Sequence, residues 1–254
     1  MSYLGYIKSI SECVLKDIAF PKVLEIGIDI GQSAIPLIHN MSNLCDEFLY
    51  VGVDIKVKKD FTEQILQMSN ISIGEFDDLC NRDVVVFEEN SLIWLDKNID
   101  SLMKFDVIFI DGDHNYHTVF NELLLCQNLI HPTSLIVCDD YRGRWSETDL
   151  FYSTKEEYKN NKLATKTIKT EKPGVKNAVN DFLINHKDQW SILESEDIGD
   201  PCFLYQKNCK FNIVKVPHDK SKIGTLSRTH KILFNTHDII SCQRPQWHLE
   251  RVSV

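Results

Sequence analysis

The sequence predicts an α/β fold, in which a mostly parallel sheet carries helices on both faces. Two observations lead to this prediction. Short apolar runs rich in Val and Ile alternate with helix-period segments, and the first such run ends in a glycine-containing turn. The 254 residues suffice for one large domain with an appendage, and an apolar content of 43% allows a core without disulfide bonds.

Seven segments have the length and composition of buried strands. They are residues 22–27, 48–54, 83–89, 105–111, 134–140, 190–196 and 202–208. The last two form a closing hairpin, so the last strand is expected to be antiparallel. Helical periodicity occurs at residues 3–18, 32–43, 61–70, 115–130 and 173–186. We therefore expect a seven-stranded sheet within a domain of residues 1–209, and residues 210–216 and 230–235 are candidates for additional strands.

The charge of the chain is unevenly distributed. The net charge is −9, yet residues 206–254 contain nine Lys and Arg against three Asp and Glu. The acidic body argues against broad nucleic-acid binding. The basic extension at 210–254 leaves four alternatives open: an anionic partner, packing on the body of the same chain, a second subunit of a homo-oligomer, or a solvated tail.

The same composition bears on the cellular compartment. No apolar run approaches the roughly 20 residues of a membrane span, and the N-terminus lacks the features of a signal peptide. The eight cysteines include no C-x-x-C pair, which makes a zinc site improbable. We expect buried free thiols in a cytoplasmic protein.

A glycine turn joins the first strand to the helix that follows. The run E-I-G-I-D-I-G-Q-S contains Glu25, Gly27, Asp29, Gly31 and Ser33. Glycines at such a turn let a ligand approach the backbone beside a helix N-terminus. Their spacing differs from that of the dinucleotide motif G-x-G-x-x-G, and a tight turn without a ligand is the alternative interpretation.

Polar residues also follow the second and third strands. Asp54 ends the second strand about 20 residues after the turn, where an acid can accept both hydroxyls of a ribose. NAD enzymes share this feature, so Asp54 alone does not select the cofactor. Asn90 and Ser91 follow the third strand, where Ser91 could act as a helix N-cap.

The most specific constellation is a group of acids at two neighbouring strand ends. The run F-D-V-I-F-I-D-G-D-H-N-Y-H contains Asp111, Asp113 and His114, and the run L-I-V-C-D-D-Y contains Asp139 and Asp140. Carboxylates at adjacent strand ends converge on one crevice, where they repel one another unless they are neutralised. A hard divalent cation with oxygen ligands neutralises them, while acids that cap helices are the alternative.

These motifs resemble those of the small-molecule O-methyltransferases related to macrocin O-methyltransferase. The similarity covers about residues 20–208 and includes the run P-G-V-K-N-A-V-N-D-F at 173–182. It implies a Rossmann-like methyltransferase fold with S-adenosylmethionine (SAM) as methyl donor. The chain departs from the family pattern at Asp29, at Asn90 and after residue 209.

The resemblance also implies roles for individual residues. It assigns Mg²⁺ to Asp111, Asp139 and Asp140, and the general base to Asp113 or His114, with Asp111 also counted as catalytic. It places Asn90 and Ser91 at the adenine. The SAM-binding residues that it implies are Glu25, Gly27, Asp29, Gly31, Ser33, Asp54, Asn90, Ser91 and Asp111.

We therefore expect Mg²⁺-assisted O-methylation of a small-molecule hydroxyl, with a sugar favoured as acceptor. The polar, Lys-rich segment 141–172 is a predicted lid, and an anionic or carrier-linked acceptor would suit its lysines. Two alternatives stay open. An NAD-linked oxidoreductase is disfavoured by Glu25, by the glycine spacing and by the paired acids at 139–140. A SAM-binding or assembly module without catalytic activity is the other.

Overall fold

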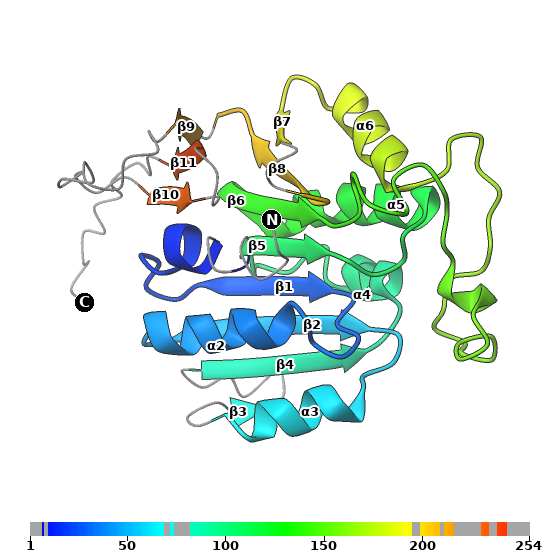
Figure 1. The fold of residues 1–254 in the computed structure, drawn as a ribbon, viewed down its shortest axis with the longest axis horizontal. Coiled ribbons are helices and arrows are strands. Elements are labelled where there is room, and N and C mark those ends of the chain that lie inside the picture. Colours follow the sequence, from blue (N-terminus) through cyan, green and yellow to red (C-terminus); the bar gives the residue numbers. More distant parts are fainter. Residues whose placement is uncertain are drawn as a thin grey trace.

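A twisted sheet lies at the centre of the computed structural model, which describes residues 7, 10–68, 72–73, 82–194, 199–208, 211–215, 230–233 and 238–242 (Figure 1). The strand order is β3-β4-β2-β1-β5-β6-β8-β7. The strand bounds are β1 Lys22–Ile26, β2 Phe48–Asp54, β3 Ser72–Ile73, β4 Arg82–Glu88, β5 Phe105–Ile110, β6 Ile130–Cys138, β7 Trp190–Leu193 and β8 Cys202–Gln206.

The pairing of the strands confirms the predicted fold class. β1 pairs in parallel with β2 and β5, and β4 and β6 extend the parallel sheet on either side. β8 runs antiparallel to both β6 and β7, as expected for the last strand. All seven predicted strands are present. The two-residue β3, which pairs with β4 at the edge, was not predicted because so short a strand has no periodicity.

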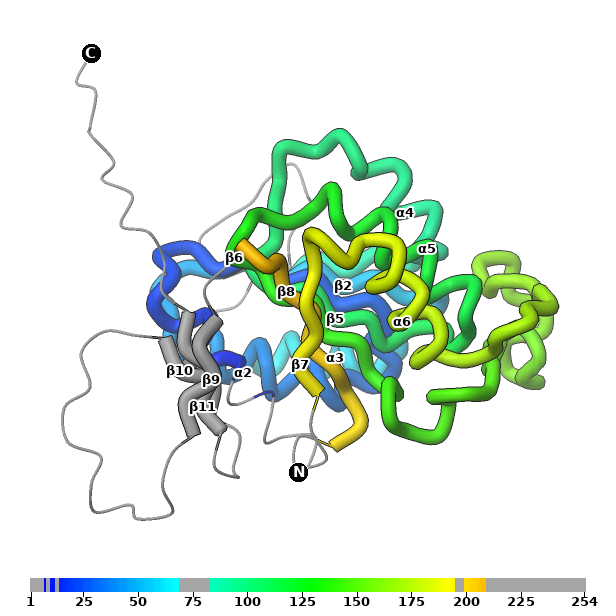
Figure 2. The backbone as a smooth tube through the Cα atoms, turned by 90° about the horizontal axis from the view of Figure 1, so that it is seen from above, coloured from blue at the N-terminus to red at the C-terminus, as the bar shows by residue number. Residues whose placement is uncertain are grey.

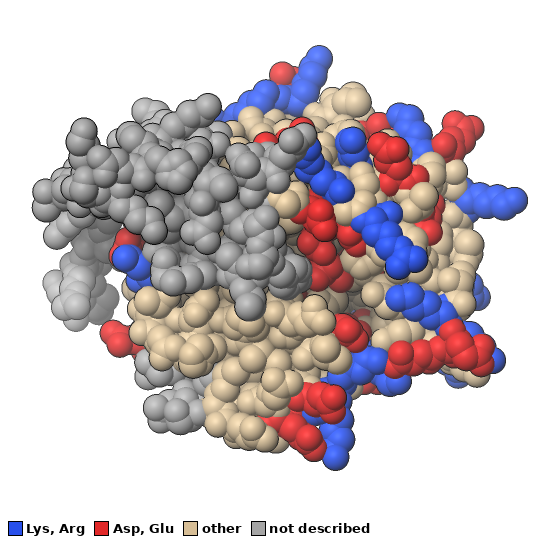
Figure 3. All heavy atoms as spheres, viewed as in Figure 1, with Lys and Arg blue, Asp and Glu red and all other residues tan. Residues whose placement is uncertain are grey.

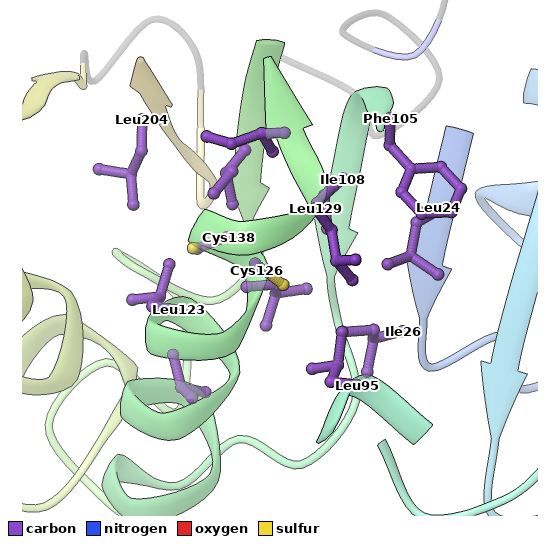
Figure 4. Close-up of a cluster of buried hydrophobic side chains, with 14 of the residues drawn as sticks. Leu24, Ile26, Leu95, Phe105, Ile108, Leu123, Cys126, Leu129, Cys138 and Leu204 are labelled. Carbon is purple, nitrogen blue, oxygen red and sulfur yellow. The ribbon is translucent and has the colours of Figure 1, made fainter. Parts of the chain in front are cut away.

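Each face of the sheet carries its own layer of helices, with bounds α2 Ala34–Leu44, α3 Lys59–Leu66, α4 Ser91–Lys97, α5 Tyr116–Cys126 and α6 Val175–Asn185. α2 and α3 pack with the π-helical turn Ser11–Leu15 in one apolar cluster. α4, α5 and α6 pack in the other, where Figure 4 shows Leu95, Leu123 and Cys126 between their helices and the sheet.

Alternation along the strands explains the two layers. In β1, Val23 belongs to the cluster of α2 and α3, whereas Leu24 belongs to the cluster of α4 to α6. β5 divides in the same way between Val107 and Ile108. Both faces are buried, so these strands read as continuous apolar runs instead of alternating polar and apolar residues. This pattern is the reason that the strands could be predicted from the sequence.

The segment 141–172, which we call the strap, lies beyond the carboxyl ends of the parallel strands (Figures 1 and 2). It leaves β6, contains the short 3₁₀ turn Tyr152–Thr154, and returns to α6 through Gly174. Parallel strands end at this edge, so the strap runs past the tips of β1, β2, β4 and β5.

The C-terminal part of the chain contributes a second, three-stranded antiparallel sheet. Its strands β9 (Phe211–Lys215), β10 (His230–Leu233) and β11 (Asp238–Cys242) have the order β10-β11-β9. The strands predicted at 210–216 and 230–235 are confirmed, and β11 was not predicted. The predicted domain boundary at 209–210 and much of the predicted N-terminal helix at 3–18 lie outside the described residues. In the part of the chain that the structure covers, no helix has the length and apolar character needed to cross a membrane.

A buried carboxyl group lies beneath the site end of the sheet. Glu122 of α5 is fully buried, and its Oε1 accepts a hydrogen bond of 2.6 Å from the hydroxyl of Ser91. Its Oε2 has no hydrogen-bond partner among the described residues. Burial raises the pKa of Glu122 to about 8, so the folded protein favours the protonated acid.

The substitution Glu122→Gln tests this assignment through the pH dependence of stability. Because the pKa is raised on folding, wild-type stability is reduced as pH rises from about 4.5 to about 8. The difference in the free energy of unfolding, Glu122→Gln minus wild type, should therefore become more positive as pH rises through this range. The increase should be at most about 1.4 kcal/mol per pH unit. Urea unfolding between pH 5 and 9 measures the difference.

The exposed residue Glu63 of α3, which pairs with Lys59, provides the matched control. Glu63→Gln should change stability by no more than about 0.5 kcal/mol. A difference between Glu122→Gln and wild type that stays constant from pH 5 to pH 9 would show that Glu122 is ionised in the folded protein.

Candidate functional site

Two adjoining cavities open at the carboxyl ends of the strands, under the strap. The first has an empty volume of about 520 Å³ and the second about 600 Å³, each including space open to solvent. Such volumes suit small-molecule ligands. The residues that line both cavities are Gly27, Asp29, Asp111 and Tyr152.

The glycine turn after β1 forms the floor where the cavities meet. Gly27 has a φ of +86°, and a Cβ built there would lie 2.2 Å from the carbonyl oxygen of Asp111. Only glycine permits this approach of the two strand ends. Asp29 has a φ of +46°, so this acid adopts the left-handed backbone that glycine takes more readily.

Two of the predicted turn residues lie beneath the cavities instead of lining them. Glu25 is fully buried and accepts hydrogen bonds from Ser33 and, at 2.8 Å, from the hydroxyl of Tyr50. Burial raises the pKa of Glu25 to about 7. Gly31 is backed by Phe61 and Ile35. Glu25 and Gly31 support the turn from below, whereas Ser33 lines the second cavity.

Asp54 lines the first cavity and also holds the glycine turn in place. Its Oδ2 accepts hydrogen bonds from the backbone N–H groups of Ile28, at 2.7 Å, and Asp29, at 2.9 Å. Its Oδ1 accepts one from Lys56 N at 2.9 Å. Burial raises the pKa of Asp54 despite these bonds. The position of Asp54 at the end of a strand did not indicate that its carboxylate also holds the glycine turn.

The residues after β4 correct one expectation. Asn90, not Ser91, is the N-cap of α4, because Asn90 has extended backbone and its side chain accepts from Ile93 N at 3.3 Å. Ser91 is already helical, and its hydroxyl bonds to Glu122. The amide of Asn90 donates to the carbonyl oxygen of Leu163 in the strap at 2.8 Å. Both Asn90 and Ser91 line the first cavity.

The acids predicted at two strand ends do come together, in the second cavity. Asp111, Asp139 and Asp140 line it with His114. The Nδ1 of His114 lies 3.5 Å from Asp140 Oδ2, and its Nε2 lies 4.0 Å from Asp111 Oδ1. Burial, followed by the charge of Asp140, raises the pKa of Asp139 to about 6.

Asp200 is a further acid in this neighbourhood that the sequence did not indicate. It precedes β8, and its carbonyl accepts a hydrogen bond from Arg142 N at 2.8 Å. After burial, the charge of Asp200 is the next cause that raises the pKa of Asp140. Asp200 reaches the strand ends through the antiparallel strand, so it follows no strand–acid pattern.

The structure separates the two candidate bases. His114 is buried among the acids, and burial, followed by the charge of Lys155, lowers its pKa to about 4. Its imidazole is therefore neutral near pH 7 and can accept a proton. Asp113 lines the first cavity, and its carboxylate accepts a hydrogen bond from Tyr152 N at 3.1 Å. Asp113 thus anchors the strap.

The acid cluster offers the ligand atoms of a site for a hard cation, but its side chains are too far apart to coordinate one ion together. Asp111, Asp139 and Asp140 offer oxygen ligands of the kind that Mg²⁺ prefers. Within the described residues, no group of three His, Cys, Asp or Glu side chains is close enough to hold a metal ion. The donor set therefore fits the cation in kind, and binding would draw the carboxylates together.

Hydrogen bonds at both ends dock the strap. Asp149 accepts from the backbone N–H groups of Tyr116 and Gly174, both at 2.7 Å, and from the Thr170 hydroxyl at 3.0 Å. At the far end, Glu157 pairs with Lys56 and Lys58, next to β2. The strap thereby lies over the first cavity, to which it contributes Tyr152, Tyr158 and Thr165.

The lysines of the strap differ in their surroundings. Lys159 pairs with Glu156 and Lys172 with Asp181. Figure 3 shows acidic and basic side chains interspersed on this side of the molecule. Lys155 instead lies over the ring of Tyr152, with its Nζ 4.0 Å from the ring centroid. Lys162, Lys166 and Lys169 belong to the same stretch, and among the described residues neither Lys nor Arg lines either cavity.

Comparison with known families agrees with the site. A family model described as a methyltransferase domain matches residues 24–141. Residues 24–141 are therefore similar to a methyltransferase domain. The matched segment runs from β1 to the residue after Asp140, so it contains the glycine turn, Asp54 and the acid cluster.

Several solved structures are similar to the chain at low identity. The methyltransferase MycE of the mycinamycin pathway, with Mg and S-adenosylhomocysteine (SAH), is 14% identical over 87% of this chain and 51% of that one, with a TM-score of 0.45. An O-methyltransferase from Bacillus cereus with SAH is 18% identical over 80% and 77%, with a TM-score of 0.43. The TDP-rhamnose 3'-O-methyltransferase CalS11 of calicheamicin biosynthesis is 13% identical over 80% and 78%, with a TM-score of 0.49.

These likenesses assign neither an acceptor nor a metal to this chain, because the identities and TM-scores are low. The chain spans about half the length of MycE. No curated protein sequence matches it.

The three hydrogen bonds that Asp149 accepts, which we call the clamp, lead to a prediction about the strap. Asp149→Ala removes charge-assisted hydrogen bonds worth about 1.5–3 kcal/mol each, so the undocked strap should be populated at least about tenfold more often. Trypsin should then cleave at the strap lysines faster by a similar factor, as measured by mass spectrometry of timed digests. Glu147→Ala, which removes only an exposed pair with Lys176, is the control. Equal cleavage rates in the two variants would contradict the clamp.

Proposed function

We propose that the chain is a SAM-dependent O-methyltransferase that acts on a hydroxyl of a small molecule. The observation that carries the proposal is the charge of the first cavity. Of the described residues that line it, none is Lys or Arg and five are acidic: Asp29, Asp54, Glu89, Asp111 and Asp113. Lys58 and Lys97, which pair with Asp29 and Glu89, lie outside this lining. A sulfonium and an ammonium suit these surroundings, whereas the carboxylates of the lining would repel the pyrophosphate of NAD.

The residues of the first cavity support one orientation of the donor. Asp54 Oδ1 accepts one backbone hydrogen bond, so it keeps a lone pair for a ribose hydroxyl. The adenine would lie by Ser91 and Asn90, and Asn90 would act there by holding Leu163 because its amide is already engaged. The methionyl end would then point toward Gly27, where the cavities meet.

A polyhydroxylated acceptor suits the second cavity best. Its lining is dominated by groups that hydrogen-bond hydroxyls, among them Gln32, Ser33 and His114. A flat aromatic acceptor would find Tyr152 and Ile28 as its apolar partners. We infer a sugar, and any phosphate or carrier attached to it would remain outside the carboxylate-lined space.

His114 is the base in the proposed reaction. The acceptor oxygen forms a bond to the methyl carbon while the carbon–sulfur bond breaks, and the sulfur keeps the electron pair. The hydroxyl proton passes to His114, which is neutral before the step. Asp140, whose Oδ2 lies 3.5 Å from Nδ1, would face the imidazolium that forms.

We further propose that Asp111, Asp139 and Asp140 hold Mg²⁺ beside the acceptor. The support is their convergence and the raised pKa of Asp139, which reflects the repulsion that a cation relieves. When bound, the ion would polarise the acceptor hydroxyl and lower its pKa.

Calorimetry with SAM and Asp54→Ala tests the donor site. Loss of the carboxylate should weaken SAM binding by about 2 kcal/mol, roughly 30-fold in Kd, because it removes a charged acceptor and loosens the glycine turn. NAD should not bind to the wild type. Asp60→Ala, in the first turn of α3, is the matched control. Unchanged SAM affinity in a folded Asp54→Ala protein would remove Asp54 from the site.

A methylation assay with and without EDTA tests the acceptor site. The assay uses a panel of free sugars, nucleotide-linked sugars and catechols with labelled SAM. Asp139→Asn should lower turnover by at least about 100-fold, since the metal and the base both serve the acceptor, while SAM binding persists. Full activity in excess EDTA would rule out the metal, and the carboxylates would then serve only to stabilise protonated His114.

A further inference from the structure

Tyr152 is the residue of the strap that lines both cavities. The other residues common to them, Gly27, Asp29 and Asp111, come from the ends of β1 and β5. Tyr158, also on the strap, lines the first cavity and is absent from the lining of the second. The boundary between the two cavities therefore has a sheet-derived floor and an aromatic wall that the strap supplies.

We propose that Tyr152 is a positioning residue for methyl transfer: its ring, placed at the junction of the donor and acceptor cavities, fixes the separation of the methyl group and the acceptor oxygen. This inference rests on the proposed function. It assigns the strap a part in aligning the reactants, in addition to its part as a cover.

The backbone around Tyr152 is tied to the same turn that carries the base. Tyr152 N donates to Asp113 at 3.1 Å, and Leu150 N donates to the carbonyl of His114 at 2.9 Å. The ring centroids of Tyr152 and His114 are 6.3 Å apart. Asp113 and His114 are consecutive, and they accept these two hydrogen bonds from the backbone at Tyr152 and Leu150. The backbone contacts therefore fix the position of the Tyr152 ring relative to the His114 ring.

Neighbouring side chains hold the ring itself. Tyr158 meets it edge-on, with centroids 5.3 Å apart, and Lys155 Nζ lies 4.0 Å from its centroid. These contacts restrict the aromatic rotamer without using the hydroxyl. Burial, followed by the charge of Asp111, raises the pKa of Tyr152, so the phenol stays protonated and does not compete with His114 as base.

The alignment matters because the reaction is an in-line displacement. Sulfur, methyl carbon and acceptor oxygen must be collinear, and a displacement of about 1 Å can cost about 100-fold in rate. Removing the ring would join the two cavities and let donor and acceptor shift relative to each other. Binding of the nucleoside depends on other residues, notably Asp54, so donor affinity should suffer less than turnover.

The test compares kcat and KM for Tyr152→Ala, Tyr152→Phe and Tyr158→Ala with SAM as donor. The acceptor is TDP-rhamnose. If the wild type does not methylate TDP-rhamnose, the acceptor is the free or nucleotide-linked sugar that the wild type methylates fastest. Tyr152→Ala should lower kcat about 100-fold, with the Kd of SAM raised less than about fivefold by calorimetry. Tyr152→Phe should stay within about threefold of wild type, because the ring remains. Tyr158→Ala should instead act mainly on KM for SAM.

Two variants control for folding and for general effects on the strap. Tyr152→Leu keeps apolar bulk without a ring, so it should fold if Tyr152→Ala does not and should show the same loss of kcat. Lys159→Ala, at an exposed pair with Glu156, should behave as wild type.

The outcomes are separable. Retained kcat in a folded Tyr152→Ala or Tyr152→Leu protein would overturn the inference, as would a loss in Tyr152→Phe equal to that in Tyr152→Ala. A wild type that binds SAM yet methylates no member of the panel would overturn the proposed function, and the inference with it.

Discussion

The close approach of β1 and β5 at Gly27 is the contact on which the site depends. The backbone of Gly27 lies against the carbonyl of Asp111, leaving no room for a side chain. Gly27 and Asp111 therefore face both cavities. If this contact were wider, the acids after β5 and β6 would no longer adjoin the space beside Asp54. One steric constraint at two strand ends thus makes the two cavities adjoin.

The acids at this edge of the sheet have two different uses. Some of them accept hydrogen bonds from backbone N–H groups and so hold neighbouring segments in place. Asp54 holds the glycine turn in this way, and Asp113 and Asp149 hold the strap. Asp139 and Asp140 also accept backbone hydrogen bonds, but they lie side by side at the second cavity, where burial and the charge of Asp140 raise the pKa of Asp139. Their place beside one another, and not a lack of hydrogen bonds, distinguishes these two acids from the carboxylates that hold the turn and the strap.

The features that the sequence could predict are those that local patterns encode. Buried parallel strands appear as apolar runs, which is why β1, β2, β4, β5 and β6 were predicted. The acid cluster was predictable because neighbouring parallel strands end at one edge.

The features that the sequence could not predict depend on contacts between distant segments. Periodicity did not indicate α4, because its seven residues are too few for a clear period, so a helix there was only implied by the N-cap alternative at Ser91. The N-cap was wrong by one residue because the choice between Asn90 and Ser91 rests on backbone dihedral angles. Asp200 and Tyr152 reach the site through an antiparallel strand and a long loop, and neither path leaves a spacing that a motif could capture.

The carboxylate lining of the first cavity has a consequence for turnover. In the proposed reaction the donor enters with a sulfonium charge and leaves as a neutral thioether, while the cavity keeps its acids. The attraction that draws the donor in is thus partly cancelled by the chemistry itself. The demethylated product is attracted less strongly than the donor by the acidic lining. The same electrostatic attraction that favours binding of the donor therefore also favours exchange of the product for a new donor.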